Sequence, residues 1–204
     1  LSIIAIDEWH ELMGGKRGIL VELAVSRLIA LSKQQGNQLS IWGISATIGN
    51  LEQAMEVLLY ASKIKGYIIK ANIHKPIEVL SVIPDEIEKY PWAGHLGIKL
   101  AEKIVPIIEQ SNTTLIFINT RGMSETWYQT LLTVAPQLAG AIALHHGSIE
   151  QELRLWVEDA LHTQKLKAVV CTASLDLGVD FRPVDTVIQV GSPKGVARFL
   201  QRAG

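Results

Sequence analysis

Short apolar runs rich in Val and Ile alternate with longer amphipathic stretches along most of the chain. The apolar runs lack the polar alternation of a half-exposed strand, so they predict strands that are covered on both faces, as in a parallel sheet. The predicted strands are residues 3–6, 39–44, 67–70, 77–82, 114–118, 141–144, 167–172 and 186–190.

Helices are predicted between these strands, because apolar residues recur there at spacings of three and four. In the first of them, residues 19–33, the expected buried stripe consists of Leu20, Leu23, Ala24, Arg27, Leu28 and Leu31. The other predicted helices are residues 51–60, 96–109, 122–134 and 150–162. Strands that alternate with helices need crossover connections, so the sequence predicts the α/β class.

Two domains are predicted, because prolines and charged residues between Ile83 and Gly94 interrupt any regular element. We expect a first domain at residues 1–82, a linker at 83–94 and a second domain at 95–204. The chain also opens inside an apolar strand, and an unpaired strand exposes its backbone groups. We therefore expect both domains to be incomplete, and exposed sheet edges to favour self-association.

Composition narrows the setting of the protein. The 204 residues carry 19 Lys and Arg against 20 Asp and Glu, for a formal net charge of −1. This composition is typical of globular domains and excludes disorder. The charge balance argues against a uniformly basic nucleic-acid binder and leaves a local basic groove open. Cys171 is the one cysteine and has no internal partner for a disulfide, and no apolar run reaches the roughly 20 residues that span a bilayer. We expect a reducing, cytoplasmic setting without membrane contact.

Candidate catalytic residues follow two of the predicted strands. Asp7, Glu8 and His10 come after the first strand, and Ser45 and Thr47 come after the second. The carboxyl ends of parallel strands meet at one sheet edge, which is where such sheets bind ligands. One carboxylate there is suited to hold Mg²⁺ on a nucleotide phosphate and the next to activate water. The alternative is that Asp7 caps the following turn while Glu8 and His10 are solvated.

Other chemistry is not predicted. His145 and His146 are adjacent on a strand and point to opposite faces, so they are a poor zinc pair. Cys171 has no neighbouring base and is expected to be buried. Trp127 and Trp156 lie in helical patterns and are expected to pack against a sheet.

The motifs together resemble those of the superfamily 2 DExH-box helicases. Asp7-Glu8-Trp9-His10 is similar to motif II, and Ser45-Ala46-Thr47 is similar to motif III. Residues 115–121, 169–180 and 201–204 are similar to motif IV, motif V and the first half of motif VI. More narrowly, residues 7–12, 15–18 and 191–198 resemble the corresponding segments of the Lhr helicases. The Trp at position 9 is similar to the motif II of their ligase-associated bacterial branch.

This resemblance implies two tandem RecA-like domains, a P-loop NTPase helicase core, with ATP and Mg²⁺ between them. It implies that Asp7 holds the metal, that Glu8 activates water, that Ser45 and Thr47 couple the site to the strand, and that His10 links motif II to the second domain. The nucleotide would also meet Gly178, Asp180, Gln201 and Arg202. The nucleic-acid backbone would meet Thr120, Arg121, His146, Gly147, Ser148, Thr172, Ser174 and Lys194.

The implied function is an ATP-dependent helicase or translocase on single-stranded DNA, acting in DNA repair with partners such as a DNA ligase. Backbone contacts do not distinguish DNA from RNA, so a related RNA helicase, a restriction-enzyme motor and a non-catalytic nucleic-acid-binding module stay open. The chain holds no Gly-x-x-x-x-Gly-Lys-Ser/Thr loop, and the arginines of motif VI would follow Gly204. We therefore expect this polypeptide alone not to turn over ATP.

Overall fold

The computed structural model describes residues 2–45, 48–70, 76–84, 97–175, 184–193 and 195–203. These residues fall into two compact units, Leu1–Lys75 and Pro76–Gly204, each with its own hydrophobic core. Residues 76–82, which the sequence placed with the first domain, group with the second unit. In that stretch of chain, the carbonyl of Ile83 accepts a hydrogen bond from Lys103 Nζ at 3.1 Å.

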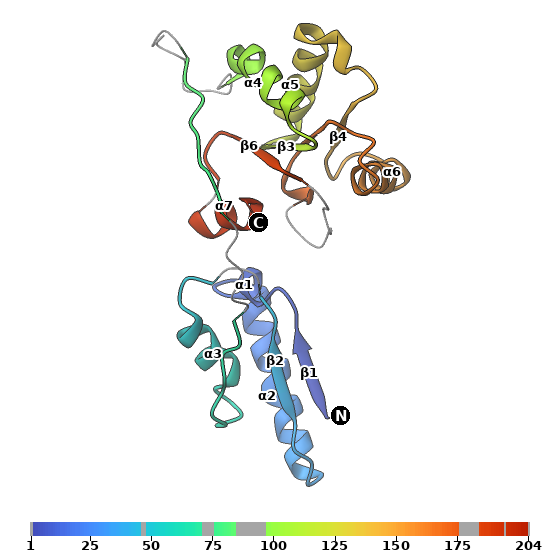
Figure 1. The fold of residues 1–204 in the computed structure, drawn as a ribbon. Coiled ribbons are helices and arrows are strands. Elements are labelled where there is room, and N and C mark those ends of the chain that lie inside the picture. Colours follow the sequence, from blue (N-terminus) through green and yellow to red (C-terminus); the bar gives the residue numbers. More distant parts are fainter. Residues whose placement is uncertain are drawn as a thin grey trace. The chain divides into compact units, whose positions relative to one another are not determined.

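The first unit is built on a parallel pair of strands. In the pair, β1 (Ile3–Ile6) runs beside β2 (Ser40–Gly43), with Ile3 opposite Ser40 and Ile6 opposite Gly43. The crossover between them contains α1 (Trp9–Leu12) and α2 (Lys16–Gln34), and α3 (Leu51–Leu59) follows β2 (Figure 1). Because the strands are parallel, both end at the same edge of the pair.

Helix α2 buries a different face from the one that the sequence predicted. Val25 and Ile29 lie in the core, whereas Leu20 and Leu23 are 66% and 62% exposed. Gly18 permits close packing on this face, since a Cβ at this position would lie 2.2 Å from the carbonyl oxygen of Leu12. The side of α2 that carries Gly18, Val25 and Ile29 therefore approaches the rest of the unit, and the leucine stripe is left outside.

The second unit contains a four-stranded, all-parallel sheet with the strand order β4-β5-β3-β6. Its strands are β3 (Thr114–Ile118), β4 (Ile142–His145), β5 (Ala168–Cys171) and β6 (Thr186–Val190). Its helices are α4 (Ala101–Gln110), α5 (Arg121–Val134), α6 (Gln151–His162) and α7 (Val196–Ala203), with the 3₁₀ turns η1 (Ile98–Leu100), η2 (Pro136–Leu138) and η3 (Ala173–Leu175).

Both faces of this sheet are covered, as the apolar runs predicted. Along β3, Ile116 and Ile118 pack into one core with residues of α4 and α5, and Leu115 and Phe117 pack into a second core with residues of α6. Figure 1 shows α4 and α5 together on one side of the sheet. The α/β class with parallel sheets is therefore confirmed.

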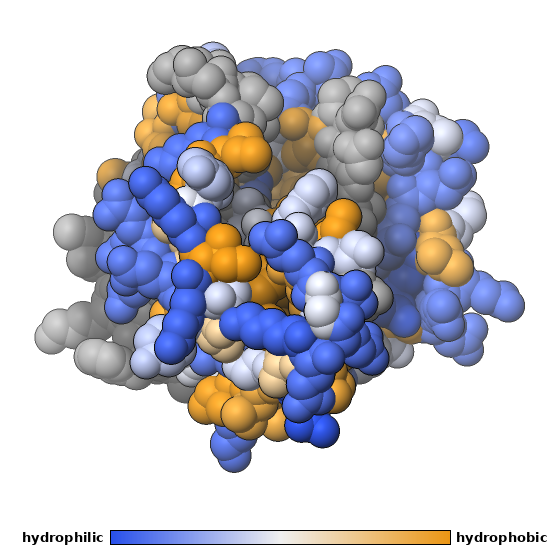
Figure 2. All heavy atoms as spheres, turned by 90° about the horizontal axis from the view of Figure 1, so that it is seen from below, coloured by the Kyte–Doolittle hydropathy of each residue, from blue (hydrophilic) through white to orange (hydrophobic). Residues whose placement is uncertain are grey.

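Two predicted strands are wrong. Residues 67–70 and 77–82 have no regular structure, and Ile69 and Leu80 are 95% and 79% exposed. Among the described residues neither stretch pairs with a strand, and apolar character alone does not form one. Figure 2 shows hydrophobic side chains, in orange, reaching the surface between hydrophilic ones.

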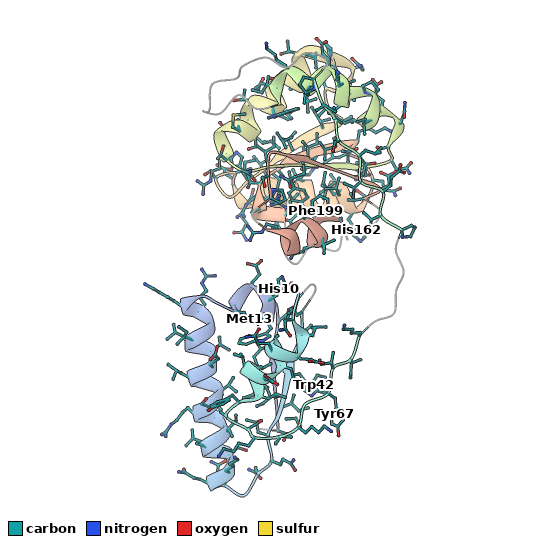
Figure 3. The ribbon with its side chains drawn as sticks, turned by 90° about the vertical axis from the view of Figure 1, so that its left-hand side faces the viewer. His10, Met13, Trp42, Tyr67, His162 and Phe199 are labelled. Carbon is teal, nitrogen blue, oxygen red and sulfur yellow. The ribbon has the colours of Figure 1, made fainter. Side chains whose placement is uncertain are left out.

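The tryptophans divide between core and surface. Trp127 is buried, as predicted, but Trp156 is 57% exposed, so its predicted packing against a sheet is wrong. Trp42 of β2 is also exposed and, like Tyr67, is visible on the first unit in Figure 3. Within the described residues, no helix combines the length and the apolar character that crossing a membrane requires.

Candidate functional site

The chain turns sharply where β1 ends, at Asp7 and Glu8. Glu8 has φ 51° and ψ 42°, a left-handed conformation that residues with a side chain rarely adopt. The amide of Glu8 donates to Asp7 Oδ1 at 2.9 Å, and the amide of Trp9 donates to the carbonyl of Ile44 at 3.1 Å. Strain of this kind costs about 1–3 kcal/mol and persists where the surroundings impose it. Here it holds the Glu8 carboxylate beside His10.

Trp9 anchors this turn to α3. Its side chain is buried, and its Nε1 donates to the carbonyl of Ala54 at 3.0 Å. A Cβ at Gly43, across from Ile6 in the strand pair, would lie 2.7 Å from Leu58 of the same helix. Packing against α3 thus holds the turn that carries Asp7 and Glu8 in place.

His10 joins the ends of both strands. Its Nδ1 lies 2.9 Å from Ser45 Oγ and 3.3 Å from Glu8 Oε2. Its side chain is only 9% exposed, which rules out the solvated His10 of the alternative interpretation, although Asp7 does bond the amide of the turn. The hydroxyl of Ser45 and the ring of His10 are therefore in direct contact. Thr47 lies outside the described residues.

The donor set at the end of β1 fits a magnesium ion. Asp7 is exposed and Glu8 is half-buried, and carboxylate oxygens are the ligands that Mg²⁺ takes, with water and phosphate completing its shell. Within the described residues, no group of three or more His, Cys, Asp and Glu side chains could hold a metal by itself. One or two carboxylates are what a metal shared with a nucleotide needs.

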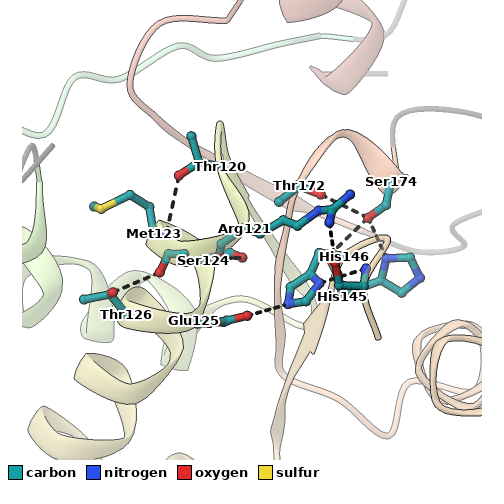
Figure 4. Close-up of polar contacts among 12 residues, drawn as sticks. Thr120, Arg121, Met123, Ser124, Glu125, Thr126, His145, His146, Thr172 and Ser174 are labelled. Carbon is teal, nitrogen blue, oxygen red and sulfur yellow. Dashed lines mark hydrogen bonds and ion pairs between the residues drawn. The ribbon is translucent and has the colours of Figure 1, made fainter. Parts of the chain in front are cut away.

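In the second unit, the ends of β3, β4 and β5 bring three loops together. Thr120 begins α5, and its Oγ1 accepts from the amide of Met123 at 3.4 Å. Arg121, beside it, donates through Nη1 to Ser148 Oγ in the loop after β4. Thr172, in the loop after β5, donates through Oγ1 to Ser174 Oγ at 3.4 Å. Figure 4 shows Thr120, Arg121 and Thr172 at the same edge of the sheet.

His146 departs from its expected role in contacting nucleic acid. Its side chain is buried, and its Nδ1 accepts from the amide of Ser148 at 3.2 Å. Its Nε2 lies 3.2 Å from Glu125 Oε1 without the alignment of a hydrogen bond. The buried ring therefore stabilises the loop after β4, while Gly147 and Ser148 of that loop are exposed.

His145 faces the other side of β4, as its position next to His146 predicted. Its ring lies 2.8 Å from Ser174 Oγ at Nδ1 and 3.2 Å from Glu158 Oε1 at Nε2. Burial lowers the pKa of His145, and the hydrogen bond and charge of Glu158, which act to raise it, only partly offset this effect. The ring is therefore neutral at pH 7.

Helix α7 carries the start of the motif that resembles motif VI. Arg202 stacks on the ring of Phe117, with 4.3 Å from its Cζ to the ring centroid, and its Nη1 donates to Gln189 Oε1 at 2.5 Å. Arg202 is thus tied to β3 and β6 of its own sheet. Gln201 lies on the same helix and is half-buried. Gly178, Asp180 and Lys194 lie outside the described residues.

Sequence reasoning missed the residues that support this edge. Glu125 and Glu158 contact the two histidines, and Asn119 Nδ2 donates to the carbonyl of Ser192 at 3.1 Å across from β3 to the loop after β6. A signal was available in the adjacent histidines at a strand end, since each needs a partner on its own face of the sheet.

One unit holds a parallel α/β sheet, and the other holds a parallel strand pair that ends in an acidic pair and a linked serine; both features are typical of a RecA-like helicase core. A family profile described as helicase conserved C-terminal domain matches residues 98–204, more than half of the chain. The chain belongs to this family and, among superfamily 2 enzymes, to the Lhr helicases.

The similarity to Lhr proteins extends over the whole chain. The chain is 37% identical over 210 residues to the ATP-dependent helicase Lhr-Core protein 2 of Thermococcus barophilus. The alignment covers 100% of this chain and 24% of that protein. The chain is 34% identical over 206 residues to the Lhr-Core helicase of Methanothermobacter thermautotrophicus, and the alignment covers 98% of this chain and 23% of that protein. The chain therefore spans about a quarter of the length of these curated relatives.

Solved structures agree with this assignment. The helicase Lhr of Mycobacterium smegmatis, bound to single-stranded DNA and AMP-PNP, aligns with a TM-score of 0.77 at 31% identity, over 98% of this chain and 26% of that one. The helicase MrfA bound to DNA aligns with a TM-score of 0.76 at 21% identity, over 100% of this chain and 29% of that one, which shows the fold alone.

Proposed function

We propose that this chain is part of an ATP-dependent helicase or translocase that moves along single-stranded DNA. The observation that carries the proposal is the position of His10, whose Nδ1 lies 3.3 Å from Glu8 Oε2 and 2.9 Å from Ser45 Oγ. A motor must connect the carboxylate that activates water to a part of the site that moves. This imidazole makes that connection between the ends of β1 and β2.

Each residue at the end of β1 and β2 has a distinct task in this proposal. Asp7 holds Mg²⁺, which neutralises charge on the nucleotide phosphates when it is bound. Glu8 orients and deprotonates the attacking water, and its left-handed backbone aims the carboxylate at His10. Ser45, together with Thr47, passes the state of Glu8 to the rest of the protein.

The second unit contacts the strand in this proposal. Hydroxyls, backbone amides and arginine suit phosphate contacts because they position a strand without reading its sequence. The M. smegmatis Lhr structure, which holds single-stranded DNA, supports this role for its relative here. The proposed strand contacts are Thr120, Arg121, Gly147, Ser148, Thr172, Ser174 and Lys194, and the proposed nucleotide contacts are Gly178, Asp180, Gln201 and Arg202.

The wider setting is part of the same proposal. We infer a cytoplasmic protein of the ligase-associated branch that acts in DNA repair, with a DNA ligase among its partners. The basis is the resemblance of motif II, Asp7-Glu8-Trp9-His10, to the ligase-associated branch, in which Trp9 is the distinguishing residue. Self-association of the isolated chain through exposed sheet edges belongs to the same proposal.

The test is ATP hydrolysis by the full-length protein, with and without single-stranded DNA or RNA, beside a Glu8→Gln variant. We expect turnover that single-stranded DNA stimulates and that Glu8→Gln abolishes. If RNA stimulates turnover and DNA does not, the substrate is RNA and not DNA. Turnover that is absent, or that ignores both nucleic acid and Glu8→Gln, would favour a non-catalytic nucleic-acid-binding module.

A further inference from the structure

His145 is buried at the end of β4 and has no part in the function proposed so far. Its backbone carbonyl accepts from the amide of Thr172 at 3.2 Å and lies 3.2 Å from Ser174 Oγ. Its ring Nδ1 lies 2.8 Å from the same Ser174 Oγ. Backbone and ring together therefore hold the loop after β5, which carries two proposed strand contacts (Figure 4).

The chemistry of the partners fixes the direction of the hydrogen bonds. Glu158 Oε1, 3.2 Å from Nε2, belongs to a carboxylate that only accepts, so the ring carries its proton on Nε2. Nδ1 is then the acceptor, and the hydroxyl of Ser174 donates to it. The oxygen of Ser174 is left to accept from Thr172 Oγ1, at 3.4 Å. A continuous chain of donors thus runs from Thr172 through Ser174 and His145 to Glu158.

Burial keeps the ring of His145 neutral, against the net effect of the charges around it. Glu158 and Arg154 both lie on α6 and act in opposite directions on the pKa of the ring, while burial lowers it. Ser174 on η3 is uncharged. A neutral ring at pH 7 has one donor and one acceptor, which are the two roles that its partners require.

We propose that His145 and Glu158 form a positioning pair that fixes the Ser174 hydroxyl, and with it the loop after β5, in the orientation that meets the nucleic-acid backbone. This inference rests on the proposed function. His145 is buried and acts only through Ser174. Its loss therefore weakens strand binding and leaves the chemistry at Asp7 and Glu8 unchanged.

The test compares two replacements of His145 in the full-length protein. His145→Gln keeps a polar atom near Nε2 and loses the one that contacts Ser174, whereas His145→Asn keeps a polar atom near Nδ1. We expect His145→Gln to raise the single-stranded DNA concentration that half-saturates ATPase stimulation roughly three- to tenfold, as for one lost hydrogen bond. Maximal turnover at saturating DNA stays within about twofold of wild type. His145→Asn restores most of the affinity.

A double substitution shows whether His145 acts through Ser174. If it does, His145→Gln adds little to the effect of Ser174→Ala, because the second change removes a contact that is already lost. Asp185→Asn, which weakens the opposite edge of the same sheet, serves as the control for stability. It lowers the melting temperature of this unit without raising the half-saturating DNA concentration.

Three results would overturn the inference. The first is an unchanged half-saturating concentration in His145→Gln, and the second is full additivity of His145→Gln with Ser174→Ala. The third is an equal loss of affinity in Asp185→Asn at a matched loss of melting temperature. If turnover of the wild-type protein ignores single-stranded DNA, the proposed function fails and this inference fails with it. Stimulated wild type with unaffected His145→Gln refutes the inference alone.

Discussion

Replacing Asp185 by Asn tests what holds β6 in the sheet of the second unit. The carboxylate of Asp185 accepts from the amide of Asn112 at 2.9 Å, from Asn112 Nδ2 at 2.9 Å and from the amide of Thr113 at 3.1 Å. In D185N one carboxylate oxygen becomes an NH₂ group that faces a donor, and the other becomes a neutral acceptor. Hydrogen bonds to charged groups contribute about 1.5–3 kcal/mol each, against about 0.5–1.5 kcal/mol for neutral ones.

Solvent reduces this loss, because the side chain of Asp185 is exposed. We therefore expect D185N to lower the free energy of unfolding of the second unit by about 1–2 kcal/mol. Burial acts to raise the pKa of Asp185, but the hydrogen bonds from Asn112 and Thr113 outweigh it and lower the pKa below its usual 3.8. The stabilisation is thus complete above pH 3.8 and is lost as the pH falls through the folded-state pKa.

The measurement is urea unfolding of wild type and D185N between pH 3 and 7, with hydrogen exchange in β6 to assign the loss to this unit. Wild type and D185N should differ at pH 7 and converge at acidic pH, since protonation of Asp185 removes the same charge. A variant as stable as wild type at pH 7, or a difference that persists unchanged to pH 3, would refute this account of the clamp.

Three further changes test other parts of the fold by unfolding measurements. Trp9→Phe should cost about 1–3 kcal/mol, because it removes the buried hydrogen bond that Nε1 donates to the carbonyl of Ala54 and part of a buried ring; equal urea midpoints would contradict this. Gly18→Ala should cost more than about 2 kcal/mol through its clash with backbone, whereas Gly122→Ala, which has open space, should be neutral or stabilising. The second unit should lose stability as the pH falls below 6.5, because the lowered pKa of His145 disfavours its protonation when folded, and His145→Asn should flatten this dependence.

The strands that carry the site could be predicted from sequence, but their support could not. Asp7 and Ser45 each follow a short apolar run, and the parallel pairing of the two runs puts both residues at one edge. The predicted strand at residues 67–70 was wrong, because a strand also needs a neighbouring strand to pair with, and the local sequence does not show whether one is present. The buried stripe predicted on α2 was wrong, because Val25 and Ile29 form the buried face and the close approach at Gly18 lies on the same side of the helix.

The roles of individual residues at the site were harder to predict than its location. His146 and Arg202 carry polar groups in motifs that resemble binding motifs, yet the ring of His146 is buried and Arg202 stacks on Phe117. Sequence spacing places a residue on an edge of the sheet, but the neighbouring layer decides whether its side chain faces solvent. Glu125 and Glu158 belong to that layer, and nothing in the local sequence connects them to the histidines.

The two units use the same three side-chain types in different ways. In each, a histidine Nδ1 bonds a serine that follows a neighbouring strand, at 2.9 Å for His10 with Ser45 and 2.8 Å for His145 with Ser174. At His145 the carboxylate of Glu158 binds the other nitrogen, so the ring and the serine are held in one arrangement. At His10 the carboxylate of Glu8 lies 3.3 Å from the same nitrogen that contacts the serine. Carboxylate and hydroxyl therefore share one ring atom, so we expect replacement of Glu8 to alter the contact between His10 and Ser45.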